Sequence, residues 1–167
     1  MIKFRRMKFK DINLIVKWLK KREVNHYMSS KVRNGTTLEH EEEIFKTQVI
    51  KKKTRIMFII QDEEKPIGNV DLVDIDLIDK NAMLAIMIGE DGYRGKGIGG
   101  KALDFITKYG FEELGLHKIS LQVNTDNIPA VKCYQKFGFI EEGRLKEHAL
   151  IEGQFKDEII MSLFSDK

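Results

Sequence analysis

Apolar residues recur with two different spacings along the chain, and each spacing predicts a different kind of element. Helical spacing predicts a helix after Asp11, a second from Thr37 to about Lys51, and a long helix over Gly97–Glu113. A short helix is expected after Asn127, and Asp11 and Asn127 are of the residue types that cap a helix N-terminus. The polar stretch between the first two helices is expected to end in a turn at the Asn-Gly pair of residues 34–35.

Other segments are rich in β-branched and aromatic residues, which predicts strands. They are Met1–Arg6, Arg55–Gln61, Pro66–Leu77, Ala82–Ile88, Lys118–Val123, Phe139–Leu150 and Phe155–Phe164. Ala82–Ile88 is apolar on both faces, as expected for a central strand that is covered on both sides. The order of elements, β-α-α-β-β-β-α-β-α-β-β, predicts a mixed α/β (α+β) fold. We expect a twisted, mostly antiparallel sheet of about seven strands with helices on both faces.

Length and composition narrow the class of protein. The 167 residues fit a single domain over 1–167, and the 42% hydrophobic and 33% charged residues fit a soluble globular chain. No apolar run approaches the roughly 20 residues of a membrane helix, so no membrane partner is expected. One cysteine excludes an intrachain disulfide, which suits a cytoplasmic location, and the four histidines show no metal-ligand spacing.

Charge is distributed unevenly along the chain. Residues 1–60 carry 16 Lys or Arg and 6 Asp or Glu, whereas the whole chain has a net charge of only +3. A basic first third could contact RNA. Interleaved acids at Glu39 and at positions 41–43 break that positive field, however, so nucleic acid is not the expected partner.

The densest chemical signal is a glycine-rich turn at residues 94–100, between an apolar strand and an amphipathic helix. Such a junction presents free N–H groups and the positive end of a helix dipole, which suits a diphosphate. A Walker loop requires Ser or Thr after Gly-Lys, but Gly97 follows Lys96. The dinucleotide fingerprint also fails, because the glycines are differently spaced and lie deep in the chain. A coenzyme A diphosphate loop and a ligand-free connection remain.

Two segments together resemble the GNAT superfamily of N-acetyltransferases. Residues Arg94–Gly99 are similar to its R/Q-x-x-G-x-G/A motif. Asn124–Phe139 is similar to its second conserved segment, with Asn127, Tyr134 and Lys136 in register. Both motifs occur in the family's order. Softer similarity near residues 114–127 and 141–164 points to the branch that holds ribosomal-protein N-terminal acetyltransferases and spermidine acetyltransferases.

The resemblance implies an acyl-CoA N-acetyltransferase-like fold, acetyl-CoA as cosubstrate, no metal, and direct attack by an amine within a ternary complex. It implies that pantetheine lies along Ala82–Ile88 and that a backbone N–H near Met87 and Ile88 stabilises the oxyanion. It also makes Tyr134 the candidate catalytic acid. The residues implied to bind the cofactor are Met87, Ile88, Arg94, Gly95, Lys96, Gly97, Ile98, Gly99, Asn127 and Lys136.

The role of Tyr134 is limited by its chemistry. A tyrosine pKa of about 10 exceeds a thiol pKa of about 8.5, so full proton transfer to the sulfur is uphill by roughly 2 kcal/mol. We therefore expect Tyr134 to act mainly as a hydrogen-bond donor to the developing thiolate. Its neighbour Cys133 could be imagined as a nucleophile, but on an apolar helix without a nearby histidine it is interpreted as a small buried residue. Trp18 is interpreted as core, with a substrate groove as the alternative.

The general base is the least defined part of the site. By resemblance a glutamate is expected on the strand after the long helix, but Gln122 stands there. Asp71, Asp74 and Glu147 are alternative bases, or water removes the proton. An amine of pKa about 8 costs about 1.4 kcal/mol to deprotonate at pH 7 and an alkylamine about 4.6 kcal/mol, so a missing base favours the weaker amine.

The acceptor therefore stays open among a protein N-terminus, an amino sugar and a polyamine. The acids at 71, 74, 76 and 79 could collect a polyamine, or could simply belong to a solvated strand and turn. An acyl-CoA sensor without turnover is the alternative function, an RNA-associated protein is a weaker one, and a homodimer is possible.

Overall fold

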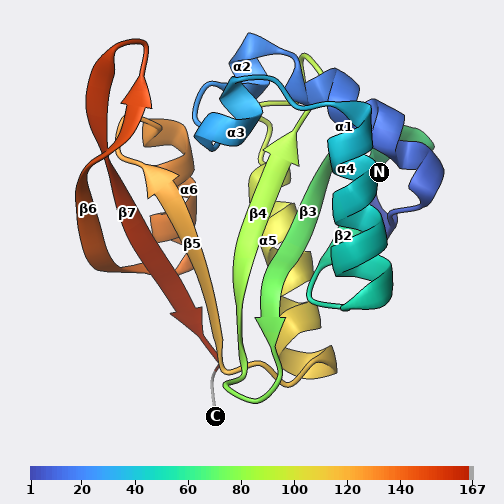
Figure 1. The fold of residues 1–167 in the computed structure, drawn as a ribbon. Helices are drawn as coiled ribbons and strands as arrows, with labels where there is room; N and C mark the ends of the chain where they lie inside the picture. The colour runs from blue at the N-terminus through green and yellow to red at the C-terminus, as the bar shows by residue number, and fades with distance from the viewer. Residues whose placement is uncertain (166–167) are drawn as a thin grey trace.

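A seven-stranded sheet runs through the computed structural model, which describes residues 1–165 (Figure 1). The strands follow the order β1-β2-β3-β4-β5-β7-β6, and among these described strands only the β4–β5 pair is parallel. Their bounds are β1 Ile2–Arg6, β2 Ile56–Asp62, β3 Lys65–Asp76, β4 Asn81–Ile88, β5 Lys118–Asn124, β6 Ile140–Ile151 and β7 Gln154–Phe164. The predicted fold class, strand number and central position of β4 are confirmed.

The long helices also occur where the apolar spacing predicts them. The α-helices are α1 Ile12–Leu19, α2 Arg22–Asn25, α3 Ser30–Arg33, α4 Leu38–Ile44, α5 Ile98–Lys108 and α6 Ile128–Phe137. Helices α4 and α5 continue as π-helical turns over Phe45–Lys51 and Tyr109–Glu113. The prediction missed α2 and α3, which are single turns without a buried residue and therefore leave no apolar period in the sequence. Within the described residues, no helix is long and apolar enough to cross a membrane.

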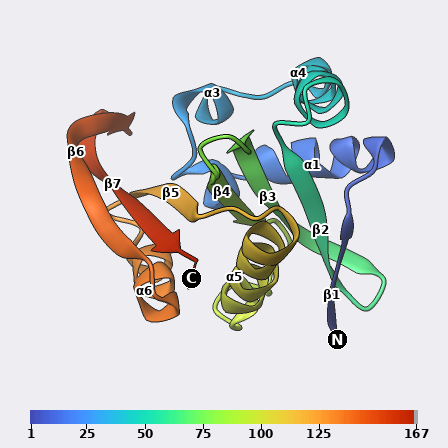
Figure 2. The same cartoon turned by 90° about the horizontal axis from the view of Figure 1, so that it is seen from below.

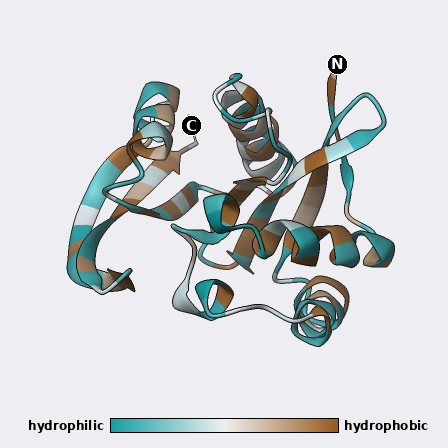
Figure 3. Ribbon diagram, turned by 90° about the horizontal axis from the view of Figure 1, so that it is seen from above, coloured by the Kyte–Doolittle hydropathy of each residue, from teal (hydrophilic) through white to brown (hydrophobic). Residues whose placement is uncertain are grey.

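Helices on opposite faces of the sheet create two hydrophobic cores. Figure 2 shows α1 and α4 on one side of the sheet and α5 and α6 on the other. The core on the α5 side contains Ile106 and Ile119, and the core under α1 and α4 contains Trp18, Ile59 and Met87. Figure 3 shows that the central strands are largely hydrophobic, whereas β6 at the sheet edge is largely hydrophilic.

Asp11 does not cap α1 with its side chain, contrary to the expectation from sequence. Its carboxylate instead accepts the backbone N–H of Lys8 at 2.8 Å and two guanidinium N–H groups of Arg5 at 2.7 and 2.9 Å. Burial alone would raise the pKa of Asp11, but these hydrogen bonds outweigh it and hold the pKa below its usual value. The carboxylate therefore ties β1 to the start of α1.

We expect this tie to be lost in acid. Because the pKa of Asp11 is lower in the folded chain, its contribution to stability is present above the unfolded pKa of about 3.9 and disappears as the pH falls through the folded value. Asp11→Asn should therefore melt below the wild type at pH 7, and the gap should narrow towards pH 3. Thermal unfolding of both proteins at the two pH values measures this. A gap that widens in acid would contradict it.

Candidate functional site

The two central strands separate partway along their length. β4 and β5 pair only at Asn81–Lys118, Ala82–Ile119 and Met83–Ser120. Beyond these pairs the strands diverge, which Figure 1 shows as a V between the arrows of β4 and β5. The edge of β4 from residue 84 to 88 is consequently not paired to β5. A peptide-like group can form hydrogen bonds with such a free edge.

The glycine-rich turn lies where β4 leads into α5. Gly95 and Gly97 have φ values of 74° and 73°, and Gly97 is the N-cap of α5. A Cβ added at either glycine would meet no protein atom within 4 Å, so the space in front of this backbone is open. Lys96 is exposed beside it, and Ile98 is buried and anchors the first turn of the helix. Bare amides, a helix N-terminus and a lysine together fit a diphosphate.

Met87 and Ile88 lie at the end of β4, as the sequence interpretation requires. Met87 is buried under α1 and α4, and Ile88 packs against the core on the α5 side. The carbonyl of Ile88 accepts a hydrogen bond from Nε of Arg94 at 3.2 Å. Arg94 thus connects the strand edge to the glycine-rich turn.

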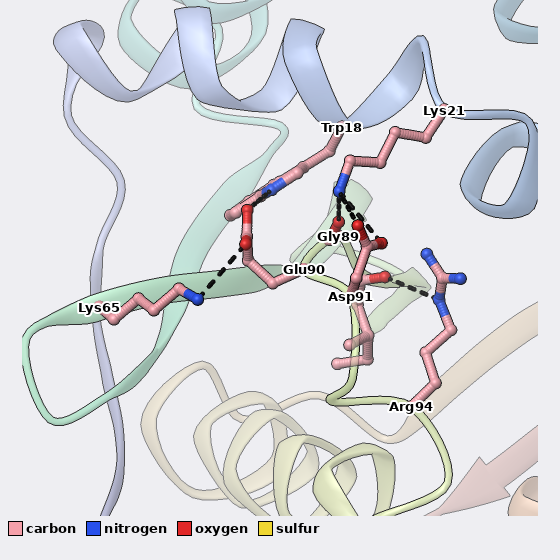
Figure 4. A network of polar contacts seen from close by, with 8 residues as sticks. Trp18, Lys21, Lys65, Gly89, Glu90, Asp91 and Arg94 are labelled. Atoms are coloured by element: carbon pink, nitrogen blue, oxygen red, sulfur yellow. Dashed lines mark hydrogen bonds and ion pairs between the residues drawn. The ribbon is translucent and has the colours of Figure 1, made fainter.

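Helix α1 and the residues that follow it hold the segment that joins β4 to this turn (Figure 4). The indole Nε1 of Trp18 donates to Glu90 at 2.8 Å, and the ammonium of Lys21 reaches the Gly89 carbonyl and the Asp91 carboxylate at 3.1 Å. The hydrogen bond from Trp18, helped by nearby lysines, keeps the pKa of Glu90 below its usual value. Trp18 is fully buried, so its interpretation as core holds, while the positioning contacts of Lys21 and Glu90 were not foreseen.

Tyr134 lies on α6, which packs against α5. Its ring contacts the Phe139 ring edge-on with centroids 5.8 Å apart, and burial raises the pKa of the hydroxyl above its usual value. Tyr134 therefore stays protonated as a donor well above neutral pH. Burial also raises the pKa of the Cys133 thiol, which agrees with its interpretation as an unreactive packing residue.

The other two α6 candidates differ from each other. Asn127 occupies the N-cap position, but its side chain makes no capping hydrogen bond, so the expectation that it caps the helix is wrong for the side chain. Pro129 in the first turn has no N–H, which reduces the need for a cap. Within residues 1–165 the Asn127 amide is therefore not committed to capping α6 and is available to another partner. Lys136 is exposed in the last turn of α6.

A carboxylate stands beside the glutamine that occupies the expected base position. Gln122 on β5 donates its side-chain N–H to Glu158 on β7. The imidazole Nε2 of His148 lies 3.8 Å from the same carboxylate, and only 13% of the Glu158 side chain is exposed. The sequence analysis missed Glu158, because alternation along β7 does not show that β7 pairs with β5 and so brings Glu158 beside Gln122.

The carboxylates proposed from sequence lie elsewhere. Asp71 is fully buried and pairs with Arg55 at 2.6 Å, so it is not free to collect a polyamine. Asp76 accepts two backbone N–H groups in the β3–β4 turn, at the opposite end of β4 from the glycine-rich turn. Glu147 has a positive φ at a bulge of β6. Within residues 1–165, no three His, Cys, Asp or Glu side chains are grouped to hold a metal ion.

The β6–β7 hairpin reaches the helical segment that follows α1. Glu152 at its turn pairs with Arg22 and lies 3.7 Å from His26. Arg33 donates to the Leu150 carbonyl at 3.1 Å. These contacts join the β6–β7 side of the V to α2 and α3, on the face opposite α5 and α6 (Figure 2).

Comparisons with known proteins agree on one family. The model of the acetyltransferase (GNAT) domain matches residues 2–140. A spermidine N(1)-acetyltransferase of Vibrio cholerae is 36% identical over 111 residues, which are 66% of this chain and 64% of that protein. The enzyme of the same name from Escherichia coli K12 is 35% identical over 107 residues, 64% of this chain and 57% of that protein. The matched segments thus span less than two thirds of these relatives.

Solved structures extend the similarity over the whole fold. The Vibrio cholerae spermidine N-acetyltransferase in complex with CoA and spermine aligns with a TM-score of 0.89 and 28% identity, covering 98% of this chain and 95% of that one. A ribosomal N-acetyltransferase of Bacillus subtilis, described as putative, is 27% identical over 96 residues, 58% of this chain and 52% of that protein. The match to the GNAT domain, together with the separation of β4 from β5 and the glycine-rich turn at the end of β4, shows that the chain belongs to the GNAT acetyltransferase family.

Proposed function

We propose that the protein is an acetyl-CoA-dependent N-acetyltransferase that acts on a primary amine by direct attack in a ternary complex. The observation that carries the proposal is the open, glycine-lined turn at Arg94–Gly99 beside the free edge of β4. Backbone N–H groups of the turn and the ammonium of Lys96 would hold the diphosphate. Bound there, acetyl-CoA supplies the activated thioester.

The chain's own groups account for the remaining demands of acyl transfer. The free β4 edge near Met87 and Ile88 would orient the pantetheine arm and offer an N–H to the oxyanion. Tyr134, kept protonated by burial, would donate a hydrogen bond to the departing sulfur. The Asn127 amide, which does not cap α6, would contact the cofactor arm. Lys136 is exposed and could meet a phosphate.

A polyamine is the acceptor class that we favour. The names of the Vibrio cholerae and Escherichia coli relatives support it, and so does the spermine in the similar solved structure. The preference for a weaker amine rested on a missing carboxylate, and the Glu158 carboxylate beside Gln122 weakens that reason. Protein N-termini and amino sugars are the competing acceptors. Self-association belongs to the same proposal because a similar spermidine acetyltransferase is described as dodecameric, and the single cysteine favours the cytoplasm.

Mass spectrometry of a mixed panel tests the reaction and the acceptor together. Acetyl-CoA would be incubated with polyamines, amino sugars and N-terminal peptides, and acetylated products identified beside the release of free thiol. We expect acetylated polyamine. Tight coenzyme A binding without turnover of any amine would instead support the acyl-CoA sensor.

Tyr134→Phe separates an enzyme from a sensor. Because the hydroxyl serves as a donor to the leaving sulfur, its loss should lower kcat about 100-fold. Affinity for coenzyme A should not change. Steady-state kinetics and calorimetry measure the two effects. Tyr109→Phe is the matched control, since the Tyr109 hydroxyl contacts Arg6 on β1, away from the V. Equal turnover by Tyr134→Phe and the wild type would rule out the proposed role.

A further inference from the structure

Glu158 is distinguished from the other well-buried acids by what surrounds it. Its side chain is 13% exposed, yet within residues 1–165 its only ion-pair partner is His148, which is charged only when protonated. Other shielded carboxylates have a permanent cation beside them, as Asp71 has Arg55 and Asp11 has Arg5. A buried carboxylate without such a cation costs stability, which calls for a functional reason.

The register of the sheet fixes the face on which Glu158 lies. Directly paired residues of adjacent strands point to the same face, and Glu158 pairs with Asn124 of β5. Four residues along each strand, the hydroxyl groups of Ser120 and Ser162 contact each other at 2.8 Å on this same face. Ser120 in turn pairs with Met83 of β4.

The same face on β4 also carries Met87, which lies under α1 and α4. The alternate residues Ile119 and Ile159 belong to the core on the α5 side. Glu158 therefore lies across the V from the end of β4. It is on the face of the sheet that α1 covers, and not on the opposite face that α5 covers. An amine that approaches a thioester on β4 from the α1 face of the sheet would pass strands β5 and β7, and therefore the Glu158 side chain.

The hydrogen bond from Gln122 orients the carboxylate. The amide N–H of Gln122 donates to Oε2, which requires that oxygen to act as an acceptor. His148 also lies nearest to Oε2, so both contacts of the carboxylate within residues 1–165 are made by that oxygen and Oε1 is left for another partner. Because 52% of the His148 side chain is exposed, the imidazole connects this carboxylate to solvent.

From these contacts we propose that Glu158 is the catalytic base, with Gln122 as its positioning residue and His148 as the exit for the proton. This inference rests on the proposed acetyltransferase function. Glu158 takes one proton from the substrate ammonium, and the freed nitrogen lone pair forms the bond to the thioester carbonyl carbon. The C–S bond breaks, a second proton of the nitrogen goes to the sulfur, and Glu158 returns its proton to solvent through His148. The products are an amide, a thiol and one proton.

The test compares Glu158→Gln with the wild type between pH 7 and pH 10, using acetyl-CoA and spermidine. At pH 7 we expect kcat to fall at least 100-fold with unchanged coenzyme A affinity. The difference should shrink to about fivefold at pH 10, because an alkylamine of pKa about 10.4 then supplies its own neutral form. A merely structural role would give a loss that does not depend on pH. His148 is the titratable group that faces Glu158, so His148→Gln is measured beside it and should cost only a few fold.

Glu141→Gln is the matched control, because Glu141 is an exposed acid on β6 that pairs with Arg144. Glu158→Asp keeps the charge but withdraws the carboxylate, and should lose about tenfold at pH 7 even if the glutamine variant does not fold. A loss below threefold in both variants, or one that is constant with pH, would overturn the role of Glu158 while leaving the acetyltransferase intact. A wild type that turns over no amine would overturn the proposed function and this inference with it.

Discussion

Asp71→Ala is expected to lower the free energy of unfolding by about 3 kcal/mol, the largest loss that we expect from removing a single polar contact. The Asp71 carboxylate is fully buried on β3, between its ladder partners Met57 and Ala85. It accepts a hydrogen bond from Arg55 at 2.6 Å and one from the Asn69 amide at 2.9 Å. Its removal leaves a largely buried guanidinium without a counter-charge. Urea unfolding measures the loss.

A double-mutant cycle separates the ion pair from the cavity that alanine leaves. Because the cost of Asp71→Ala comes mainly from the stranded cation, Arg55→Met in the same chain should restore more than half of the lost stability. Glu42→Gln is the control, since the exposed Glu42–Lys46 pair on α4 should be worth less than about 0.5 kcal/mol. If the stability losses of Asp71→Ala and Arg55→Met simply added in the double variant, the Asp71 carboxylate and the Arg55 guanidinium would not stabilise each other.

The sequence was sufficient for most of the fold because the strong signals were local. Ala82–Ile88 is apolar on both faces, and that pattern placed β4 at the centre of the sheet. The spacing around α5 likewise defined a long helix. Single turns such as α2 bury no residue, and no sequence pattern marks them. The hydrogen-bond partner of Asp11 could not be predicted for a different reason. Its residue type suggested that the side chain caps α1, but packing of the chain brings it to Arg5 instead.

In the candidate site, too, residues in contiguous motifs could be predicted, whereas contacts between distant strands could not. The glycine-rich turn and Tyr134 lie in contiguous motifs, so they could be named from the sequence. Glu158 comes close to Gln122 only because β7 inserts between β5 and β6, and a sequence that lists β6 before β7 does not show this order. The contact of Lys21 with Asp91 likewise joins residues 70 positions apart. Partners set by register and crossover therefore required the structure.

Gly68→Ala is expected to weaken both the fold and the binding of coenzyme A, because it disturbs the strand end on which the thioester would lie. A Cβ at Gly68 would lie 2.2 Å from the carbonyl oxygen of Met87 and 3.1 Å from Cα of Ile88. Both are backbone atoms, so no side-chain rotation relieves the clash and β4 itself must move. We expect a loss of about 2–3 kcal/mol in stability.

The displacement has a further consequence at the site. Gly89 and Glu90 donate their backbone N–H groups to the Ile67 carbonyl at 2.9 and 3.1 Å, directly beside Gly68. Moving β4 away from β3 therefore also shifts the segment that leads to the glycine-rich turn, and affinity for coenzyme A should fall more than tenfold. Calorimetric titration with coenzyme A and thermal unfolding measure the two effects separately.

Gly143→Ala provides the control for glycine replacement in a strand. Gly143 lies on β6 without a positive φ, and an added Cβ there would meet no atom within 4 Å. This variant should keep full coenzyme A affinity and lose no stability, because alanine restricts the unfolded chain more than glycine does. If Gly68→Ala behaved like Gly143→Ala in both measurements, the end of β4 would tolerate displacement. Its backbone could then not be the rigid edge along which the acyl group is held.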